Sequence, residues 1–271
     1  MAVNNSSIAL LDMNYGSLCL LNELTKSFPN EVFYYLNDFN GANFDEWSHK
    51  AVIEKIKEDT EVLLAHNPKL IVILASEYIE FAKEYFLSLA IPVINIVDMV
   101  IDSLNQDYDK KNIAFLATPY VHHANLYQRN INYSHFYPLD ASDLERIVLN
   151  DKVKTGISFD VVKRVLADLN RKAVDVIASS TYNPTLLTTE IKEVLPKTNI
   201  LNIASIIAIK ITNCLDTNDN EKLNGKGVFN IIADKEFMEE TISKLLKCKY
   251  AIKQSFNGEK KRSKEWKSFC Q

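Results

Sequence analysis

The chain has 271 residues and a formal net charge of −4, with 47% hydrophobic and 24% charged residues. This length suits one large α/β unit or two smaller lobes. No apolar run approaches the roughly 18 residues of a membrane span, and the amino terminus lacks the basic start and apolar stretch of a secretory signal. The composition excludes an integral membrane protein and predicts a soluble, cytoplasmic one.

The sequence shows no sign of a metal or cofactor site. Its four cysteines are scattered, without CxxC pairs or metal-like spacing, which predicts reduced thiols. The adjacent residues His122 and His123 point in different directions on a helix or strand, so they do not form a ligand pair. The six glycines form neither GxGxxG nor a Walker loop. We therefore expect no cofactor.

Short runs of Val, Ile and Leu alternate with segments of helical periodicity, which is typical of a parallel sheet covered by helices on both faces. The expected strands cover residues 8–12, 32–36, 70–75, 93–96, 113–117, 174–178, 200–203 and 227–232. The clearest amphipathic helices are expected over residues 44–65, 161–170 and 235–246.

Two halves of the chain look duplicated. Residues 70–76 and residues 175–180 are both apolar runs that end in serine, and each leads into a helix, a turn with proline and another strand. Ligands of open α/β sheets bind beyond the carboxyl ends of the strands. Ser76 and Ser180 are therefore expected at strand ends on opposite walls of one cleft.

Several segments resemble glutamate racemases. Residues 8–18 resemble the family's Asp-Ser-Gly-x-Gly-Gly opening, and residues 29–38 resemble its second strand. Residues 117–119 and 127–129, which read Ala-Thr-Pro and Tyr-Gln-Arg, match the start of the second lobe. Residues 180–187 match Cys-Thr-His-Tyr-Pro-Leu-Leu. The match extends over residues 8–245.

This resemblance implies a cofactor-independent racemase fold of two pseudo-symmetric parallel-sheet α/β lobes, with a small amino acid or carboxylate in the cleft between them. It places residues 1–96 and 206–258 in one discontinuous lobe and residues 97–205 in the other. It also implies a homodimer, since family members often pair.

Racemisation removes the α-proton from one face of the carbon and returns a proton to the other, so two acid/base groups must flank it. The family's two cysteines correspond to Ser76 and Ser180. A hydroxyl is about five pKa units weaker than a thiol, a handicap of roughly 10⁵ for each direction. By resemblance, the remaining catalytic positions are Asp12, Glu145 and, in place of histidine, Tyr182.

Most ligand-binding positions of the family also carry different residues here. By resemblance they are Met13, Asn43, Phe44, Glu77, Tyr78 and Thr181. We expect Glu77 to face solvent or cap the following helix, because in the cleft it would repel the glutamate side chain. Tyr78 and Tyr182 are expected to be pocket-filling aromatics rather than bases.

The sequence therefore predicts a glutamate-racemase-like protein that has lost racemase activity and serves as a binding, scaffold or regulatory protein. The alternative is an active racemase or isomerase that uses Asp12, Glu145 or Tyr182. Simpler roles stay open: Ser76 and Ser180 as small residues that bond to local backbone, and Asp12 as a helix cap.

The carboxyl terminus is basic and lacks apolar periodicity. Six lysines and arginines lie between Lys253 and Lys267, interleaved with Phe256 and Trp266. We expect residues 259–271 to form a flexible tail that binds an acidic partner or polyanion in a salt-sensitive way. In the alternative, Trp266 and Phe269 pack on the first lobe.

Overall fold

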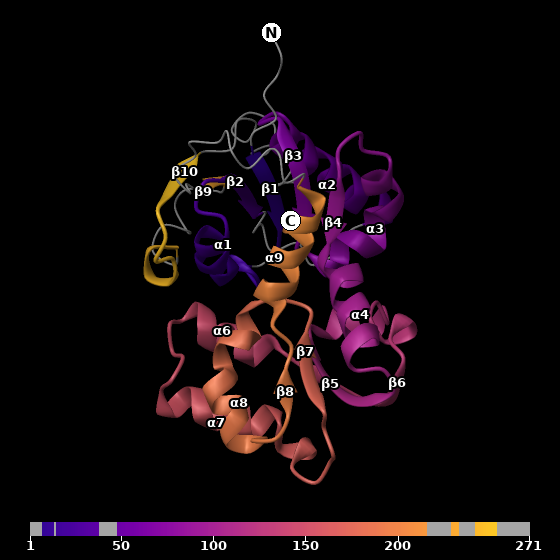
Figure 1. Cartoon of the computed structure of the whole chain (residues 1–271), viewed down its shortest axis with the longest axis vertical. Coiled ribbons are helices and arrows are strands. Elements are labelled where there is room, and N and C mark those ends of the chain that lie inside the picture. The colour runs from indigo at the N-terminus through magenta and orange to yellow at the C-terminus, as the bar shows by residue number, and fades with distance from the viewer. Residues whose placement is uncertain (1–6, 14, 38–47, 216–228, 233–241, 254–271) are drawn as a thin grey trace, which may run out of the picture.

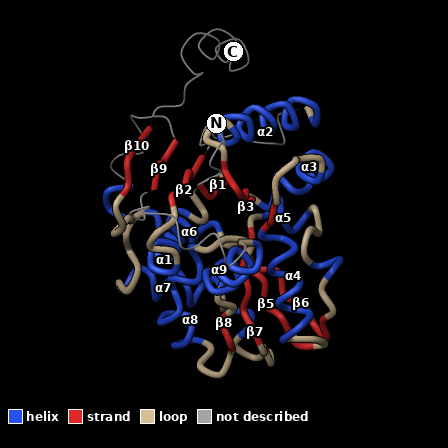
Figure 2. Tube along the Cα trace, turned by 45° about the horizontal axis from the view of Figure 1, so that its top comes forward, coloured by secondary structure: helices blue, strands red, loops and turns tan. Residues whose placement is uncertain are grey.

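The computed structural model describes residues 7–13, 15–37, 48–215, 229–232 and 242–253. These residues form two parallel sheets with helices around them (Figure 1). Each sheet is a separate group of strands, which is clearest in the second view (Figure 2). The expected fold class, an α/β protein of two parallel-sheet lobes, is confirmed.

The first lobe is built on a sheet of order β10-β9-β2-β1-β3-β4. Its strands are β1 (Ser7–Asp12), β2 (Val32–Asn37), β3 (Pro68–Ile73), β4 (Val93–Asn95), β9 (Phe229–Ile232) and β10 (Tyr250–Lys253). The second lobe is built on a sheet of order β6-β5-β7-β8. Its strands are β5 (Lys111–Ala117), β6 (Tyr133–Asp140), β7 (Val176–Ser179) and β8 (Asn199–Ile200).

Helices connect and cover the strands. The α-helices are α1 (Leu21–Ser27), α2 (His49–Leu64), α3 (Ser76–Leu87), α4 (Ile96–Asp107), α5 (Pro119–His123), α6 (Ser142–Leu149), α7 (Gly156–Val165), α8 (Thr188–Val194) and α9 (Ile203–Cys214). The 3-10 helices are η1 (Leu18–Leu20), η3 (Gln128–Asn130), η4 (Ala167–Leu169) and η5 (Asn183–Leu187). Among the residues in these ranges, no helix is long and apolar enough to cross a bilayer.

The parallel arrangement explains the continuous apolar runs. All six residues of β1 are buried, because the strand is central and paired in parallel with β2 and β3. A central strand covered on both faces has no polar side, so its sequence does not alternate. Strand Lys111–Ala117 repeats this pattern in the second lobe, with its last five residues buried.

Two strands were not predicted. β6 is an edge strand with mostly half-buried or exposed side chains, and it contains Pro138, which an edge tolerates. Such a strand lacks the apolar signal of a central one. β10 is a short strand of four residues beside β9. Parts of the expected helices, residues 44–47 and 235–241, lie outside the described residues.

Two helices join the lobes. α4 follows β4 and carries the chain from the first sheet to the second, and α9 follows β8 and carries the chain back to the first sheet. The two helices pack against each other, and the ammonium of Lys210 lies 3.8 Å from the Asp102 carboxylate. Figure 1 shows both helices running between the lobes.

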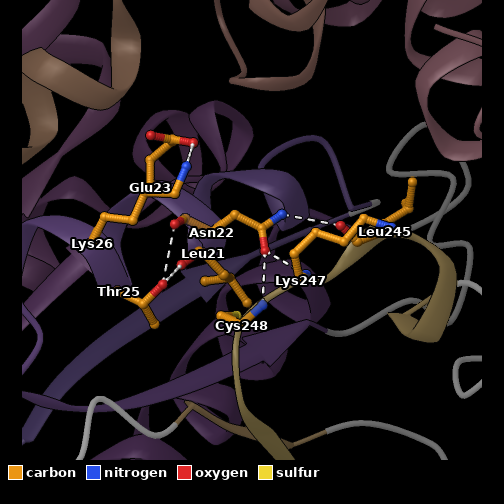
Figure 3. Close-up of polar contacts among 8 residues, drawn as sticks. All are labelled: Leu21, Asn22, Glu23, Thr25, Lys26, Leu245, Lys247 and Cys248. Atoms are coloured by element: carbon orange, nitrogen blue, oxygen red, sulfur yellow. Dashed lines mark hydrogen bonds and ion pairs between the residues drawn. The ribbon is translucent and has the colours of Figure 1, made fainter.

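The side chain of Asn22, in α1, holds the chain that leads into β10 (Figure 3). Its Nδ2 donates to the carbonyl of Leu245 at 3.0 Å. Its Oδ1 accepts from the backbone N–H groups of Lys247 and Cys248 at 2.7 and 3.2 Å. One carboxamide therefore satisfies three backbone groups of a segment more than 220 residues away.

We expect Asn22→Ala to lower the free energy of unfolding by about 2 kcal/mol, because two backbone N–H groups lose their acceptor. Urea denaturation measures this loss. Asn213→Ala is the matched control, since Asn213 is an exposed residue of α9. Equal midpoints for the two variants would contradict the anchoring role of Asn22.

Candidate functional site between the lobes

Ser76 lies at the point where the first lobe touches the second. It is the first residue of α3, directly after β3, and it is buried. Its Oγ lies 2.7 Å from the hydroxyl of Tyr127 and donates to the carbonyl of Ser180 at 3.4 Å. Ser180 follows β7 and is also buried. The structure thus brings together the two serines that the duplicated pattern placed at strand ends.

A second contact joins the lobes beside the first. Asn183 donates from its backbone N–H to the carbonyl of Gly16 at 2.9 Å, and from its side chain to the carbonyl of Tyr15 at 2.8 Å. Tyr15 has a positive φ of 59°, which turns its carbonyl within this short loop. The loop after β1 is therefore bonded directly to the loop after β7.

Gly16 leaves no room for a side chain at this contact. A Cβ on Gly16 would lie 2.7 Å from Cγ2 of Thr181 and 3.5 Å from Oε1 of Glu145. The backbone of the first lobe therefore approaches these two side chains of the second lobe as closely as glycine permits.

Gly16→Ala is expected to destabilise the protein by about 1–3 kcal/mol, because Thr181 or the loop must move to admit the methyl group. Gly156→Ala serves as the control, since a Cβ there meets nothing within 4 Å. Thermal unfolding of both variants measures the difference. If the two variants unfolded at the same temperature, the lobes would be less tightly apposed at Gly16 than the structure shows.

Asp12 ends β1 and is fully enclosed. Its carboxylate accepts from the backbone N–H groups of Met13 and Ser17 at 2.8 and 3.1 Å and from the Tyr35 hydroxyl at 2.7 Å. Burial raises the pKa of Asp12 to about 6, although these three donors lower it. Ser17 directly precedes the 3-10 helix Leu18–Leu20, so Asp12 also orders the start of that helix.

Glu145 supplies a second carboxyl, which is half-buried and comes from the first turn of α6 in the second lobe. It accepts from the hydroxyl of Thr181 at 2.6 Å. Burial raises the pKa of Glu145 to about 7, and the neighbouring charges of Glu77 and Asp12 raise it further.

Glu77, the residue after Ser76, is the third carboxyl of this group. It is 9% exposed and accepts from the hydroxyl of Thr118, in the second lobe, at 3.4 Å. Burial raises the pKa of Glu77, with a smaller contribution from Asp12. The expectation that Glu77 faces solvent is wrong, because the first turn of α3 points toward the loop between β5 and α5.

Two of the other expected site residues, Tyr78 and Tyr182, lie apart from this group. The hydroxyl of Tyr78 donates toward Asp59 of α2 at 3.5 Å. Tyr182 lines a separate cavity of about 570 Å³ with residues of α1 and α9, and burial raises its pKa to about 12. Met13 is buried next to Asp12. Asn43 and Phe44 lie outside the described residues.

Four residues at the contact were not singled out from the sequence for a role there: Tyr35, Thr118, Tyr127 and Asn183. Tyr35 bonds Asp12 and Asn183 bonds the loop after β1, whereas Thr118 and Tyr127 meet the start of α3. Of these four, only Tyr35 could have been predicted from the sequence, because it lies near the end of β2, the strand paired with β1.

Solved structures of other proteins show the same architecture. The two lobes share their fold with solved glutamate racemases. A Thermus thermophilus glutamate racemase in complex with β-chloro-D-alanine superposes with a TM-score of 0.78 at 18% identity, over 92% of this chain and 96% of that one. A Francisella tularensis glutamate racemase in complex with D-glutamate superposes with a TM-score of 0.75 at 17% identity, over 92% of this chain and 96% of that one.

Sequence relatives agree with the structural ones. A glutamate racemase of Fusobacterium nucleatum subsp. nucleatum is 21% identical over 263 residues, which cover 91% of this chain and 96% of the relative. One from Hydrogenobaculum sp. is 22% identical over 224 residues, which cover 79% of this chain and 84% of the relative. No family model matches the chain. The resemblance to glutamate racemases is confirmed.

Proposed function

We propose that this chain is a glutamate-racemase-like protein that does not racemise amino acids and serves as a binding, scaffold or regulatory protein. In this proposal, residues 1–96 and 206–258 form one lobe and residues 97–205 the other. The protein acts in the cytoplasm, as a homodimer, and its basic residues 259–271 bind an acidic partner or polyanion. That tail lies outside the described residues.

One observation carries the proposal: neither serine at the lobe contact is bonded to a base among the described residues. The hydroxyl of Ser76 meets a phenol and a backbone carbonyl. Burial raises the pKa of that phenol, Tyr127, above its usual range, so it remains a neutral partner. A serine serves as a proton carrier only beside a group that accepts its proton.

A proton-exchange assay tests the proposal. The protein is incubated in D₂O with saturating L-glutamate, D-glutamate, L-aspartate or D-aspartate, and ¹H NMR follows the loss of the Cα proton. We expect no loss above the buffer rate. The F. nucleatum relative, a glutamate racemase by name, is the positive control. Exchange within tenfold of that relative would sink the proposal.

One observation favours an alternative, an amino-acid racemase or isomerase with different acid/base groups. Asp12 and Glu145 come from different lobes, and burial raises their pKa values to about 6 and about 7. Carboxyls with such values are suited to proton transfer near neutral pH. In this case Asp12→Asn and Glu145→Gln would each abolish whatever exchange the assay detects.

A further inference from the structure

We infer that the lobe contact binds a small molecule through a protonated amine, held by Glu77 together with Asp12 and Glu145, in place of an anionic amino-acid side chain. This inference rests on the proposed function, because it names the ligand class of the same site. It follows from the charge and the unsatisfied polar atoms around the contact.

Three carboxyls converge here from both lobes. Asp12 and Glu77 are buried and Glu145 is half-buried. The charge of Asp12 raises the pKa of both other carboxyls, and the charge of Glu77 raises the pKa of Glu145, so the three share one electrostatic environment. The ion pairs found among the described residues involve none of the three. Buried carboxylates without a cation are costly, and a cationic group between them removes that cost.

Two further polar atoms beside Asp12 point to a ligand independently of these charges. Asn37 is 3% exposed, and its Oδ1 has no hydrogen-bond partner. The Oγ of Ser17, which is fully buried, also lacks one. A buried polar atom that the protein leaves unpaired costs about 1–3 kcal/mol unless something else bonds to it.

The strand register directs Asn37 toward the same site. Asn37 and Asp12 are paired residues at the ends of the parallel strands β2 and β1, so their side chains point to the same side of the sheet. Between them lies the Tyr35 hydroxyl, which receives the Asn37 amide at 3.5 Å and donates to Asp12. The unpaired oxygen therefore lies beside the carboxyl group that an amine would reach.

These atoms match an ammonium rather than a carboxylate. An ammonium carries three donors and no acceptor, whereas the contact offers carboxylate and amide oxygens. A carboxylate of the ligand, such as the side chain of glutamate, would add like charge to this group of three carboxyls. For the ligand to bind, the hydrogen bonds of Ser76 to the Tyr127 hydroxyl and to the Ser180 carbonyl must part, which costs about 1 kcal/mol each.

Isothermal titration calorimetry of the full chain at pH 8 tests this inference with 1,5-diaminopentane, L-lysine, L-glutamate and glutarate. We expect the two amines to bind at least tenfold more tightly than the two anions. Glu77→Gln should weaken amine binding at least tenfold. The matched control is Glu54→Gln, on α2, whose side chain is 61% exposed. That variant should bind as the wild type does.

Several results would overturn the inference: glutamate binding as tightly as lysine, equal effects of Glu77→Gln and Glu54→Gln, or a response to MgCl₂ alone. Absence of binding by every probe would also overturn it. Glu145→Gln provides a second variant, and removing a buried charge favours the folded state, so both variants remain testable. Cα-proton exchange from glutamate would defeat the proposed function, whereas a failure of amine binding alone defeats only this inference.

Discussion

Loss of the Cα proton of glutamate in D₂O is expected to be at least about 10⁵-fold slower with this protein than with a racemase that carries both cysteines. Forming an alkoxide from serine instead of a thiolate costs about five more pKa units, or roughly 6–7 kcal/mol. Ser76 donates its proton to a carbonyl and lies beside a neutral phenol, so no neighbour recovers this difference.

Restoring the thiols should not restore the rate. We expect S76C/S180C to remain at least about 10²-fold below a cysteine-bearing racemase, because Glu77 stays buried at the contact and repels a dicarboxylate. Adding Glu77→Asn to this double variant should raise the rate further than adding Glu54→Asn, which changes an exposed carboxylate of the same charge.

The comparison of these variants separates two causes of inactivity. If S76C/S180C reaches the rate of the F. nucleatum protein, the missing thiols alone account for the loss, and the carboxylate of Glu77 has no part in it. If the single variant S76C already converts L-glutamate into D-glutamate, only one proton carrier is needed and the two-base argument fails.

The sequence predicted the central strands well, because their apolar runs report burial on both faces. Strand Ser7–Asp12 differs from its prediction by one residue, and the parallel pairing follows from the alternation with helices. Edge strand Tyr133–Asp140 was missed, since none of its residues is fully buried and its sequence has no continuous apolar run. Pairing, rather than composition, makes these residues a strand.

The sequence pattern alone predicted only those site residues that follow a strand. Ser76 and Ser180 each follow a strand, so topology places each serine at the carboxyl edge of its own sheet. The partners they meet come from distant segments: the Tyr127 hydroxyl is bonded across 51 residues. Glu77 was expected to face solvent or cap its helix because in the cleft it would repel a glutamate side chain, and here the second lobe covers it.

The stability of this protein is expected to fall as pH rises from about 4 to about 7. Asp12 and Glu145 have pKa values of about 6 and about 7 in the folded protein, against 3.8 and 4.5 as ordinary values. Between those limits the folded state binds more protons than the unfolded state, so raising the pH favours unfolding. Each shift corresponds to about 3 kcal/mol, which is fully present below about pH 4.

Urea denaturation between pH 4 and pH 8 measures this effect by comparing the wild type with Glu145→Gln. Other carboxylates titrate in both proteins and cancel in the difference. The variant keeps an oxygen for the Thr181 hydroxyl but has no charge to desolvate. We therefore expect it to gain about 3 kcal/mol over the wild type on going from pH 4 to pH 8. Glu54→Gln, at an exposed position, should follow the wild-type curve. A constant difference between wild type and Glu145→Gln across this range would mean that Glu145 is solvated, and therefore that the lobes do not enclose it in solution.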